Sequence, residues 1–440
     1  MKRLGLAIAC FVLVCSAACT SLATQRKPYA TRRDAEAAGR IQAASPVSPT
    51  AEPSAVPTTA TSAIAARLQI THGPYLQAPL ETGMTIVWLT NKNCVSKVEY
   101  GTSTGAELTA FSAQHGLIEA NTTLHRVRIS GLVPGTKYYY RVVSTEILDF
   151  GPYKVIFGET VKSEYFSFTT LNGKKESFSF VVLNDRHEKV APFQLALNSI
   201  RWQGIDLVFL NGDMLSHVKN EQQMLKGVVE PCVGSFAKTI PFLYIRGNHD
   251  ARGYSARMLI NYFPTESQRY YYSFNHGRVH FIVLDSGEDK EDSSKEYSGL
   301  VDFDRYREEE TKWLKKDVQR NDCKKAMFRV AFVHIPPGTK GNGHGAQYVH
   351  ENWDPLFRVG KVDLLICAHT HRYARKPPQE GKQSYPTVIG DTNTVIRMDV
   401  CDGLMNATVT KDDGTVADRF TVEKKRRFWN RLFPKSHTRP

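Results

Sequence analysis

The sequence of 440 residues predicts two folded domains, an antiparallel β-sandwich followed by a layered α/β domain. From Gln69 to about Asn172, short alternating apolar runs are separated by turn residues, as in antiparallel strands. From about Glu176 the apolar runs are spaced widely, end abruptly in Asn, Asp, Gly or His, and are interrupted by helix-like stretches. Hydrophobic residues make up 41% of the chain and charged residues 23%, which predicts a globular protein.

The N-terminus has the features of an export signal. Lys2-Arg3 precedes an apolar run, Leu4 to Cys15, that is too short for a lasting membrane span. The segment Ser16-Ala17-Ala18-Cys19 resembles a bacterial lipobox, in which the cysteine becomes the lipidated first residue of the mature protein. Ordinary cleavage after Ser21-Leu22-Ala23 stays open as the alternative. Both routes predict an exported protein in the periplasm or at the cell surface, and lipidation at Cys19 would anchor it to the membrane.

The remaining boundaries follow from composition. Residues 1–19 are the predicted lipoprotein-type signal peptide, and residues 20–67, rich in Ala, Thr, Ser and Pro, are a predicted disordered linker. As a flexible coil this linker would span roughly 40 Å. The β-sandwich is assigned to residues 68–172 and the α/β domain to residues 176–423. Residues 424–440 form a basic tail in a chain of net charge +13. The tail either attracts phosphate-bearing ligands or anionic membranes, or only solvates the surface; no specific nucleic-acid binding is predicted.

Strand patterns and a turn define the first domain. Met84–Leu89, Arg126–Ile129 and Tyr138–Val143 are predicted strands. Val133-Pro134-Gly135-Thr136 is a predicted turn, in which proline fixes the first central φ and glycine can take a positive φ. Trp88 is assigned to the core of the sandwich, without a ligand role.

The second domain is defined by apolar runs at Phe178–Leu183, Leu207–Leu210, Phe242–Ile245, Val279–Leu284, Phe328–Val333 and Leu364–Cys367. Arg305–Arg320 is a predicted helix between two of them. Functional residues of α/β sheets gather in loops at the carboxyl ends of strands. Five cysteines follow residue 19, at positions 94, 232, 323, 367 and 401, and this odd, widely spaced set does not indicate a disulfide framework.

Polar clusters follow the apolar runs of this domain directly. They are Asp185-Arg186-His187, Gly212-Asp213, Gly247-Asn248-His249-Asp250, His334 and Ala368-His369-Thr370-His371. A single such cluster is common by chance, but a series of them after strand-like runs is not. Carboxylate oxygens and imidazole nitrogens suit iron, manganese and zinc. Two metal ions about 3.5–4 Å apart can hold the attacking and leaving oxygens of an in-line displacement.

These clusters resemble the motifs of the calcineurin-like metallophosphoesterase superfamily. The preceding sandwich resembles the fibronectin type III-like N-terminal domain of purple acid phosphatases, through Gly73-Pro74-Tyr75, Trp88-Leu89-Thr90, Val98-Glu99-Tyr100-Gly101 and Gly131 to Tyr138. The resemblance covers roughly Gln69 to Val422. It implies a four-layer α/β domain and two metal ions, iron, manganese or zinc.

The resemblance also implies roles for individual residues. Asp185, His187 and His371 would bind one metal ion, Asn248, His334 and His369 the other, and Asp213 would bridge them. His249 would face the leaving group as a proton donor or electrostatic stabiliser. His344, in the glycine-rich loop Gly341–Gly345, resembles a substrate-contacting histidine; an exposed loop histidine is the alternative. Asp250 is expected to be a structural acid near the site rather than a catalyst.

Two positions depart from the family patterns. Ser216 stands where purple acid phosphatases carry the tyrosine that gives their colour, and His187 stands where their first motif ends in glycine. We interpret the two differences together, with an imidazole replacing a phenolate in the same coordination sphere; His217 is an alternative replacement. Ala368 replaces the usual glycine and is expected to be tolerated if its φ is negative.

The sequence therefore predicts an exported phosphoric ester hydrolase that cleaves phosphate mono- or diesters by attack of a metal-bridging hydroxide. The alternative is a non-catalytic surface binding or scaffold protein built on the same fold. Metal identity, substrate, mono- or diester preference and oligomeric state stay open.

Overall fold

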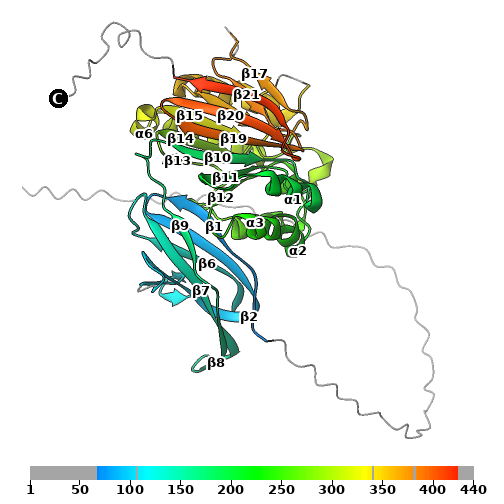
Figure 1. Cartoon of the computed structure of the whole chain (residues 1–440). Helices are drawn as coiled ribbons and strands as arrows, with labels where there is room; N and C mark the ends of the chain where they lie inside the picture. Colours follow the sequence, from blue (N-terminus) through cyan, green and yellow to red (C-terminus); the bar gives the residue numbers. More distant parts are fainter. Residues whose placement is uncertain (1–66, 106–107, 339–340, 380–382, 425–440) are drawn as a thin grey trace, which may run out of the picture. The chain divides into compact units, whose positions relative to one another are not determined.

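The computed structural model describes residues 67–105, 108–338, 341–379 and 383–424 (Figure 1). The predicted signal peptide, the linker up to residue 66 and the basic tail after Lys424 lie outside the described residues, so these predictions stay untested. Among the helices of the described part, none combines the length and the apolar character needed to cross a bilayer.

The first domain is all-β and antiparallel. Its strands are β1 (Ile70–Leu80), β2 (Gly83–Gly101), β3 (Leu108–Ala110), β4 (Ala113–Gln114), β5 (Leu117–Ile118), β6 (Thr122–Ser130), β7 (Lys137–Phe150), β8 (Val155–Lys162) and β9 (Phe166–Thr169). The long strand β2 pairs through its first half with β1 and β6 and through its second half with β7 and β3. Its pairing with β6 shifts between Leu89 and Cys94, and the strands other than β4 and β5 form one seven-stranded hydrogen-bonded sheet in which β2 joins the two parts.

The core of this domain contains Trp88, as predicted. Trp88 is fully buried among the apolar residues of β1, β2, β6, β7 and β9. Its indole Nε1 donates a hydrogen bond of 2.9 Å to Ser144 Oγ, which satisfies the one polar atom of the side chain. The predicted turn before β7 is present, with Gly135 at a φ of +65°, a value that few other residues adopt.

The second domain contains two six-stranded sheets (Figure 1). The first sheet has the order β12 (Phe242–Ile245), β11 (Ile205–Asn211), β10 (Phe178–Leu183), β19 (Thr394–Cys401), β20 (Leu404–Lys411) and β21 (Val416–Glu423). The second has the order β13 (Tyr272–His276), β14 (Val279–Leu284), β15 (Phe328–Val333), β16 (Leu364–Cys367), β18 (Thr387–Ile389) and β17 (Ala374–Lys376). The apolar runs of the sequence thus became β10, β11, β12, β14, β15 and β16.

Helices cover the outer face of each sheet. The α-helices are α1 (Val190–Ser199), α2 (Glu221–Met224), α3 (Glu230–Ser235), α4 (Leu259–Tyr262), α5 (Phe303–Asp317), α6 (Asn321–Lys325), α7 (His344–Tyr348) and α8 (Asp354–Gly360). Shorter 3₁₀ or π segments are η1 (Leu225–Val229), η2 (His249–Ala251), η3 (Tyr254–Met258), η4 (Lys295–Tyr297) and η5 (Val349–Trp353). The predicted helix 305–320 corresponds to α5, which begins and ends slightly earlier in the chain.

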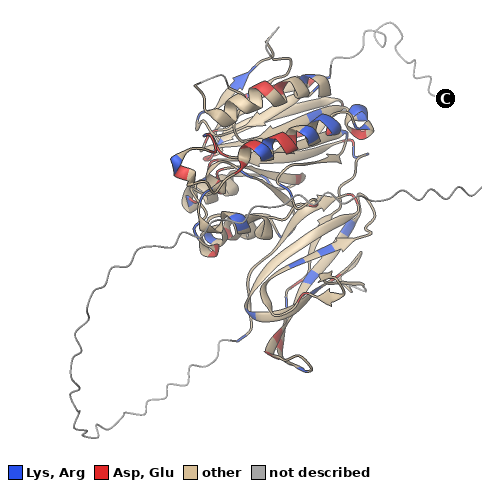
Figure 2. Cartoon of the chain, turned by 180° about the vertical axis from the view of Figure 1, so that it is seen from behind, with Lys and Arg blue, Asp and Glu red and all other residues tan. Residues whose placement is uncertain are grey.

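Three apolar cores hold these layers together. One lies between the first sheet and α1, α3 and α4, one between the two sheets, and one between the second sheet and α5 and α8. Between the sheets, Phe209 of β11 and Phe332 of β15 stack with ring centroids 4.2 Å apart. In the view of Figure 2, the helices that cover the second sheet show many charged residues, while the strands beneath them are largely uncharged. The predicted four-layer α/β fold is confirmed.

A buried ion pair joins α5 to the second sheet. His280 Nε2 lies 3.0 Å from Asp317 Oδ2, and His280 Nδ1 lies 2.7 Å from Asn275 Oδ1. Burial alone would lower the pKa of His280, but hydrogen bonds to Asp317 and Cys323 raise it to about 9.

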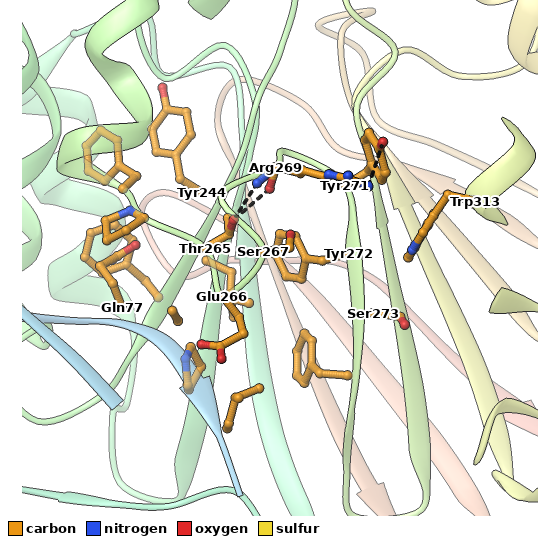
Figure 3. A pocket seen from close by; sticks show the side chains of 18 of the residues that line it. Gln77, Tyr244, Thr265, Glu266, Ser267, Arg269, Tyr271, Tyr272, Ser273 and Trp313 are labelled. Atoms are coloured by element: carbon orange, nitrogen blue, oxygen red, sulfur yellow. Dashed lines mark hydrogen bonds between the residues drawn. The ribbon is translucent and has the colours of Figure 1, made fainter. Parts of the chain in front are cut away.

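Strand β1 also contacts the α/β domain. Tyr75 is buried in the core formed with the helices, and its hydroxyl donates to the Tyr262 carbonyl at 2.8 Å. A cavity of about 210 Å³ lies between β1 and the strands β12 and β13 (Figure 3). Its lining includes Tyr271, Tyr272 and Trp313 but none of the predicted metal ligands. The predicted chemistry therefore lies elsewhere.

Candidate metal centre

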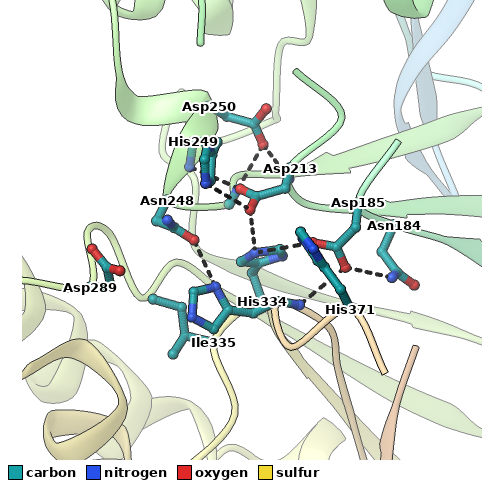
Figure 4. Close-up of polar contacts among 12 residues, drawn as sticks. Asn184, Asp185, Asp213, Asn248, His249, Asp250, Asp289, His334, Ile335 and His371 are labelled. Atoms are coloured by element: carbon teal, nitrogen blue, oxygen red, sulfur yellow. Dashed lines mark hydrogen bonds and ion pairs between the residues drawn. The ribbon is translucent and has the colours of Figure 1, made fainter. Parts of the chain in front are cut away.

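The predicted metal ligands lie at the carboxyl ends of strands from both sheets (Figure 4). In the first sheet, β10, β11 and β12 run parallel, and Asp185, Asp213 and Asn248 follow them. In the second sheet, β15 and β16 run parallel and end at His334 and His369. Parallel strands present their carboxyl ends at one edge of the sheet, so residues far apart in sequence meet there.

Four of the predicted ligands form a first group. The ligand atoms of Asp185, His187, Asp213 and His371 all lie within 4.8 Å of one another. His187 Nε2 lies 3.0 Å from His371 Nε2, and His371 Nε2 lies 3.3 Å from Asp185 Oδ1. Two basic nitrogens and two carboxylates therefore face a common point, as in a transition-metal site.

A second group shares Asp213 with the first. Asp213, His334 and His369 also have ligand atoms within 4.8 Å of one another. His334 Nε2 lies 3.1 Å from Asp213 Oδ2, and His369 Nδ1 lies 2.9 Å from Asn248 Oδ1. The structure thus places Asp213 where a bridging ligand is required, and it brings together all the residues predicted to bind metal.

Two buried atoms test whether these residues fit metal ions. Asp185 Oδ1 and His334 Nε2 are buried and form no well-aligned hydrogen bond in the described part of the chain, and they face other candidate ligands, His371 Nε2 at 3.3 Å and Asp213 Oδ2 at 3.1 Å. The opposite nitrogen, His334 Nδ1, lies 2.8 Å from the Asn211 carbonyl and therefore carries a proton, so Nε2 is the nitrogen that would face a bound cation. Unpaired buried polar atoms are costly in a protein interior. A cation at this position would satisfy both atoms, so these residues suit a bound metal ion.

Two of the candidate histidine ligands are held in the neutral form that binds metals. Burial lowers the pKa of His187, and burial together with the charge of His334 lowers the pKa of His369 to about 4. Both imidazoles are therefore neutral near pH 7, which is the form that binds metals. Burial alone would lower the pKa of His334, but Asp213 and Asp185 raise it to about 10. The two carboxylates thus create a strongly negative potential at this point.

The backbone at the site is unusual. Asp185, His187, Asp213, His369 and His371 all have φ between 48° and 72°, in the left-handed region that residues other than glycine rarely adopt. Such conformations concentrate at functional sites, where the surrounding structure holds them in place.

Two glycines provide the space for the ligands. A Cβ atom at Gly212 would lie 2.3 Å from His334 Nδ1, and one at Gly247 would lie 2.2 Å from Asp213 Oδ1. The close approach of these loops therefore requires glycine at both positions. Ala368 does not have a positive φ, so the condition stated for this replacement is met.

His249 lies beside the ligands without belonging to either group. Its backbone N–H donates to Asp213 Oδ1 at 2.9 Å, and its Nε2 lies 4.0 Å from Asp213 Oδ2. Its Nδ1 donates to the Ser216 carbonyl at 2.8 Å, which fixes the ring orientation. The side chain remains partly exposed, as a group that meets a substrate must be.

Asp250 stabilises the loops that carry Asp213 and Gly247. Its carboxylate accepts hydrogen bonds from the backbone N–H groups of Asp213 and Gly247, at 2.8 and 2.9 Å, and from the Tyr244 hydroxyl at 2.7 Å. Burial, and then the charge of Asp213, raise the pKa of Asp250 to about 7. These contacts agree with the structural role expected for Asp250.

Residues that the sequence reasoning missed surround His249. The Arg252 guanidinium lies 3.3 Å from His249 Nε2 and is held by the buried Glu288 at 2.7 and 2.8 Å and by Asp289 at 3.3 Å. Glu288 and Asp289 lie in the polar segment that follows β14, and the sequence analysis did not consider this segment. Its acidic residues were the sequence signal that could have identified them. Asn184 was also missed, and it donates to Asp185 Oδ2 at 2.7 Å.

Two other sequence expectations have a clear position in the structure. His344, at the start of α7, has its Nε2 2.6 Å from Asp304 Oδ1, so its imidazole is already engaged by a carboxylate; substrate contact stays a prediction. Neither Ser216 nor His217 belongs to the groups of candidate ligands found in the described residues, whereas His187 does. This placement agrees with His187 as the replacement for the missing tyrosine.

The two domains match known families. Residues 178–373 match the calcineurin-like phosphoesterase family, and residues 73–170 match the purple acid phosphatase N-terminal domain. The chain is 26% identical over 313 residues to probable purple acid phosphatase 20 of Arabidopsis thaliana, covering 66% of each protein. It is 23% identical over 343 residues to acid phosphatase type 7 of Homo sapiens, covering 69% of this chain and 70% of that protein. The chain spans slightly less than two thirds of the length of the Arabidopsis relatives.

Solved structures show the same fold at low sequence identity. The purple acid phosphatase PPD1 of yellow lupin superposes with a TM-score of 0.62 at 15% identity, over 82% of this chain and 75% of that chain. The structure of PhoD superposes with a TM-score of 0.55 at 13% identity, over 80% of this chain and 89% of that chain.

Proposed function

This chain joins a purple acid phosphatase N-terminal domain to a calcineurin-like phosphoesterase domain, and we propose that it is an exported phosphoesterase with two metal ions. Its substrates are phosphate mono- or diesters. The observation that carries the proposal is the convergence of the two ligand groups on Asp213, together with the buried Asp185 Oδ1 and His334 Nε2, which face the other candidate ligands. Bound metal ions, iron, manganese or zinc, would activate water and polarise the phosphoryl oxygens.

The protein's own residues position the reaction. Asp185, His187 and His371 would hold one ion and Asn248, His334 and His369 the other, with Asp213 shared. The Ser216 carbonyl holds the Nδ1 proton of His249, so Nε2 is the atom that exchanges a proton with the leaving group. Arg252, fixed by Glu288, places a positive charge next to that nitrogen, where it favours an anionic ester.

Metal analysis and hydrolysis test this proposal together. The purified protein is expected to contain about two transition-metal ions and to hydrolyse an aryl phosphate, with loss of activity after chelation and recovery on metal addition. Parallel assays with alkyl monoesters and with diesters define the preferred substrate class. Full activity after exhaustive chelation, with no metal detected, would refute the proposal, and bound metal without hydrolysis of any ester would favour a binding or scaffold role.

Export and anchoring form a separate part of the proposal. The charged start, the apolar run and Cys19 support lipidation, and the linker would tether the hydrolase outside the bilayer, where it meets soluble esters. One acyl chain anchors weakly, whereas several anchor firmly. Mass spectrometry of the membrane fraction tests this: lipidated Cys19 is expected. An unmodified N-terminus at Thr24 in the soluble fraction indicates ordinary secretion instead. Cys19→Ser is expected to release a lipoprotein from the membrane.

A further inference from the structure

The β7–β8 hairpin of the first domain exposes a cluster of large apolar side chains. Its members are Leu148, Phe150, Tyr153, Ile156 and Phe157, which we call the apolar tip. Leu148 is 61% exposed, Phe157 is 55% exposed and Tyr153 is fully exposed. Exposed apolar residues are common singly, but a contiguous group marks an interaction site.

The pairing of the strands explains why both faces of the hairpin are open. Strand β7 pairs with β9 over Lys137–Tyr140 and with β2 over Tyr139–Glu146. Beyond Glu146 it pairs only with β8, as in the partners Asp149 and Ile156 or Phe150 and Val155. The end of the hairpin is therefore a two-stranded ribbon that extends past the rest of its domain, as the position of β8 shows (Figure 1). A two-stranded ribbon has no core of its own in which to bury these side chains.

The point where the chain enters the domain indicates what the tip contacts. Arg67, the first described residue, pairs with Glu159 of β8 at 3.7 Å. Glu159 lies four residues after Val155, the first residue of β8, or about 13 Å along a strand. Arg67 therefore enters the domain beside this same hairpin, so a lipid anchor at Cys19 would put the tip within reach of the bilayer.

We propose that the apolar tip inserts into the interfacial region of the lipid bilayer. Tyrosine and phenylalanine side chains suit this position, because an aromatic ring can lie at the level of the headgroups. The exposed charged residues of the turn are Asp149 and Lys154, which balance each other. Binding is therefore apolar and needs no anionic lipid. This proposal rests on the proposed export, because only an exported protein would meet the outer membrane surface. Vesicle binding can nevertheless be measured without reference to export or to hydrolysis.

The test uses the mature chain from Thr20 onward, prepared without an acyl group, and vesicles of uncharged phosphatidylcholine. Combined substitution of the tip, Phe150→Ser, Tyr153→Ser and Phe157→Ser, is expected to lower the partition coefficient at least about tenfold, since each aromatic ring loses apolar burial. The matched control removes exposed apolar residues of the α/β domain, Leu195→Ser, Leu300→Ser and Val359→Ser, and is expected to bind like the parent. Unchanged hydrolysis and thermal unfolding show that both variants fold.

A second measurement locates the tip. Tyr153→Trp is expected to be quenched by brominated lipid tails, whereas Leu195→Trp is not. Raising the salt concentration is expected to leave binding unchanged, because no charge contact is involved. Equal partitioning of the tip variant and the parent would overturn the proposal. So would binding that requires anionic vesicles and disappears with salt, which would point to the basic tail. A dimer that the tip substitutions dissociate would instead identify a second copy as the partner. Loss of metal or hydrolysis with intact vesicle binding would refute only the proposed activity.

Discussion

Gly247→Ala tests the close packing that positions the shared carboxylate. Gly247 does not have a positive φ, so its backbone accepts alanine, and the effect comes from contact alone. The added Cβ would lie 2.2 Å from Asp213 Oδ1 and 2.4 Å from Asp213 N, whereas ordinary contacts begin at 3.4 Å. The carboxylate must therefore move by about 1.2 Å (3.4 − 2.2).

This displacement is large for a metal site. Metal–ligand distances in a working site vary by about 0.2 Å, and Asp213 belongs to both groups of ligands. Gly247→Ala is therefore expected to weaken both sites, so that the dialysed protein keeps less than about half of the metal of the parent. Overpacking also costs about 1–3 kcal/mol. Metal quantification at several free-metal concentrations measures the affinity, and urea unfolding of the chelated protein measures stability separately.

Gly234→Ala is the matched control. Gly234 lies in α3, has no positive φ, and a Cβ there would meet nothing within 4 Å. Alanine in a helix is favoured over glycine by about 1 kcal/mol, so this variant is expected to keep its metal and to be at least as stable as the parent. A Gly247→Ala protein that binds metal with parental affinity would refute the view that Asp213 must stay where the structure places it.

Other changes probe the site and the fold. Asp213→Ala is expected to lose both metal ions and His187→Ala chiefly to weaken one site, which metal quantification distinguishes; equal losses would argue against a shared carboxylate. His249→Ala is expected to lower turnover about 10²–10⁴-fold with little change in metal content. The loss of turnover is expected to be smaller for aryl than for alkyl esters, and equal losses for the two ester types would contradict the donor role. The oxidised, iron-loaded protein is expected to lack a purple colour because Ser216 replaces the tyrosine, and a strong visible band abolished by mutating a tyrosine would show otherwise. Finally, the pKa of His280 is raised to about 9, so its ion pair stabilises the fold fully below pH 6.5. A stabilisation of about 3 kcal/mol, from (9 − 6.5) × 1.36, is expected to be lost as the pH rises through 9. Urea unfolding at several pH values should show this decline in the parent and a flatter profile for His280→Gln.

The central strands and the ligands were predictable because their signals are local. Strands such as β10 and β15 are buried on both faces, so their sequences are nearly continuous apolar runs, interrupted only by Ser179 and Arg329. Each run stops where the chain leaves the sheet, and the ligands follow at once. The predicted ends of β14 and β16 agree with the structure for the same reason.

The features that were missed depend on contacts between distant residues. Strand β19 joins the first sheet by pairing with β10, as in Val182 and Ile396, and residues so far apart in the sequence give no local signal of this pairing. Arg252 meets Glu288 only because the loops after β12 and β14 converge. Substrate contact by His344 stays a prediction, and the engagement of His344 by Asp304 could not be inferred from the glycine-rich loop in which it lies.

Because the ligands come from both sheets, metal ions bound there would act as a non-covalent cross-link across the central core. Thermodynamic linkage then requires that a change which pushes the sheets apart also weakens metal affinity, and that metal binding holds the sheets together. The stacked pair Phe209 and Phe332 lies four residues before Asp213 and two before His334. The packing of these two rings is therefore expected to affect metal affinity, although neither residue is a candidate ligand.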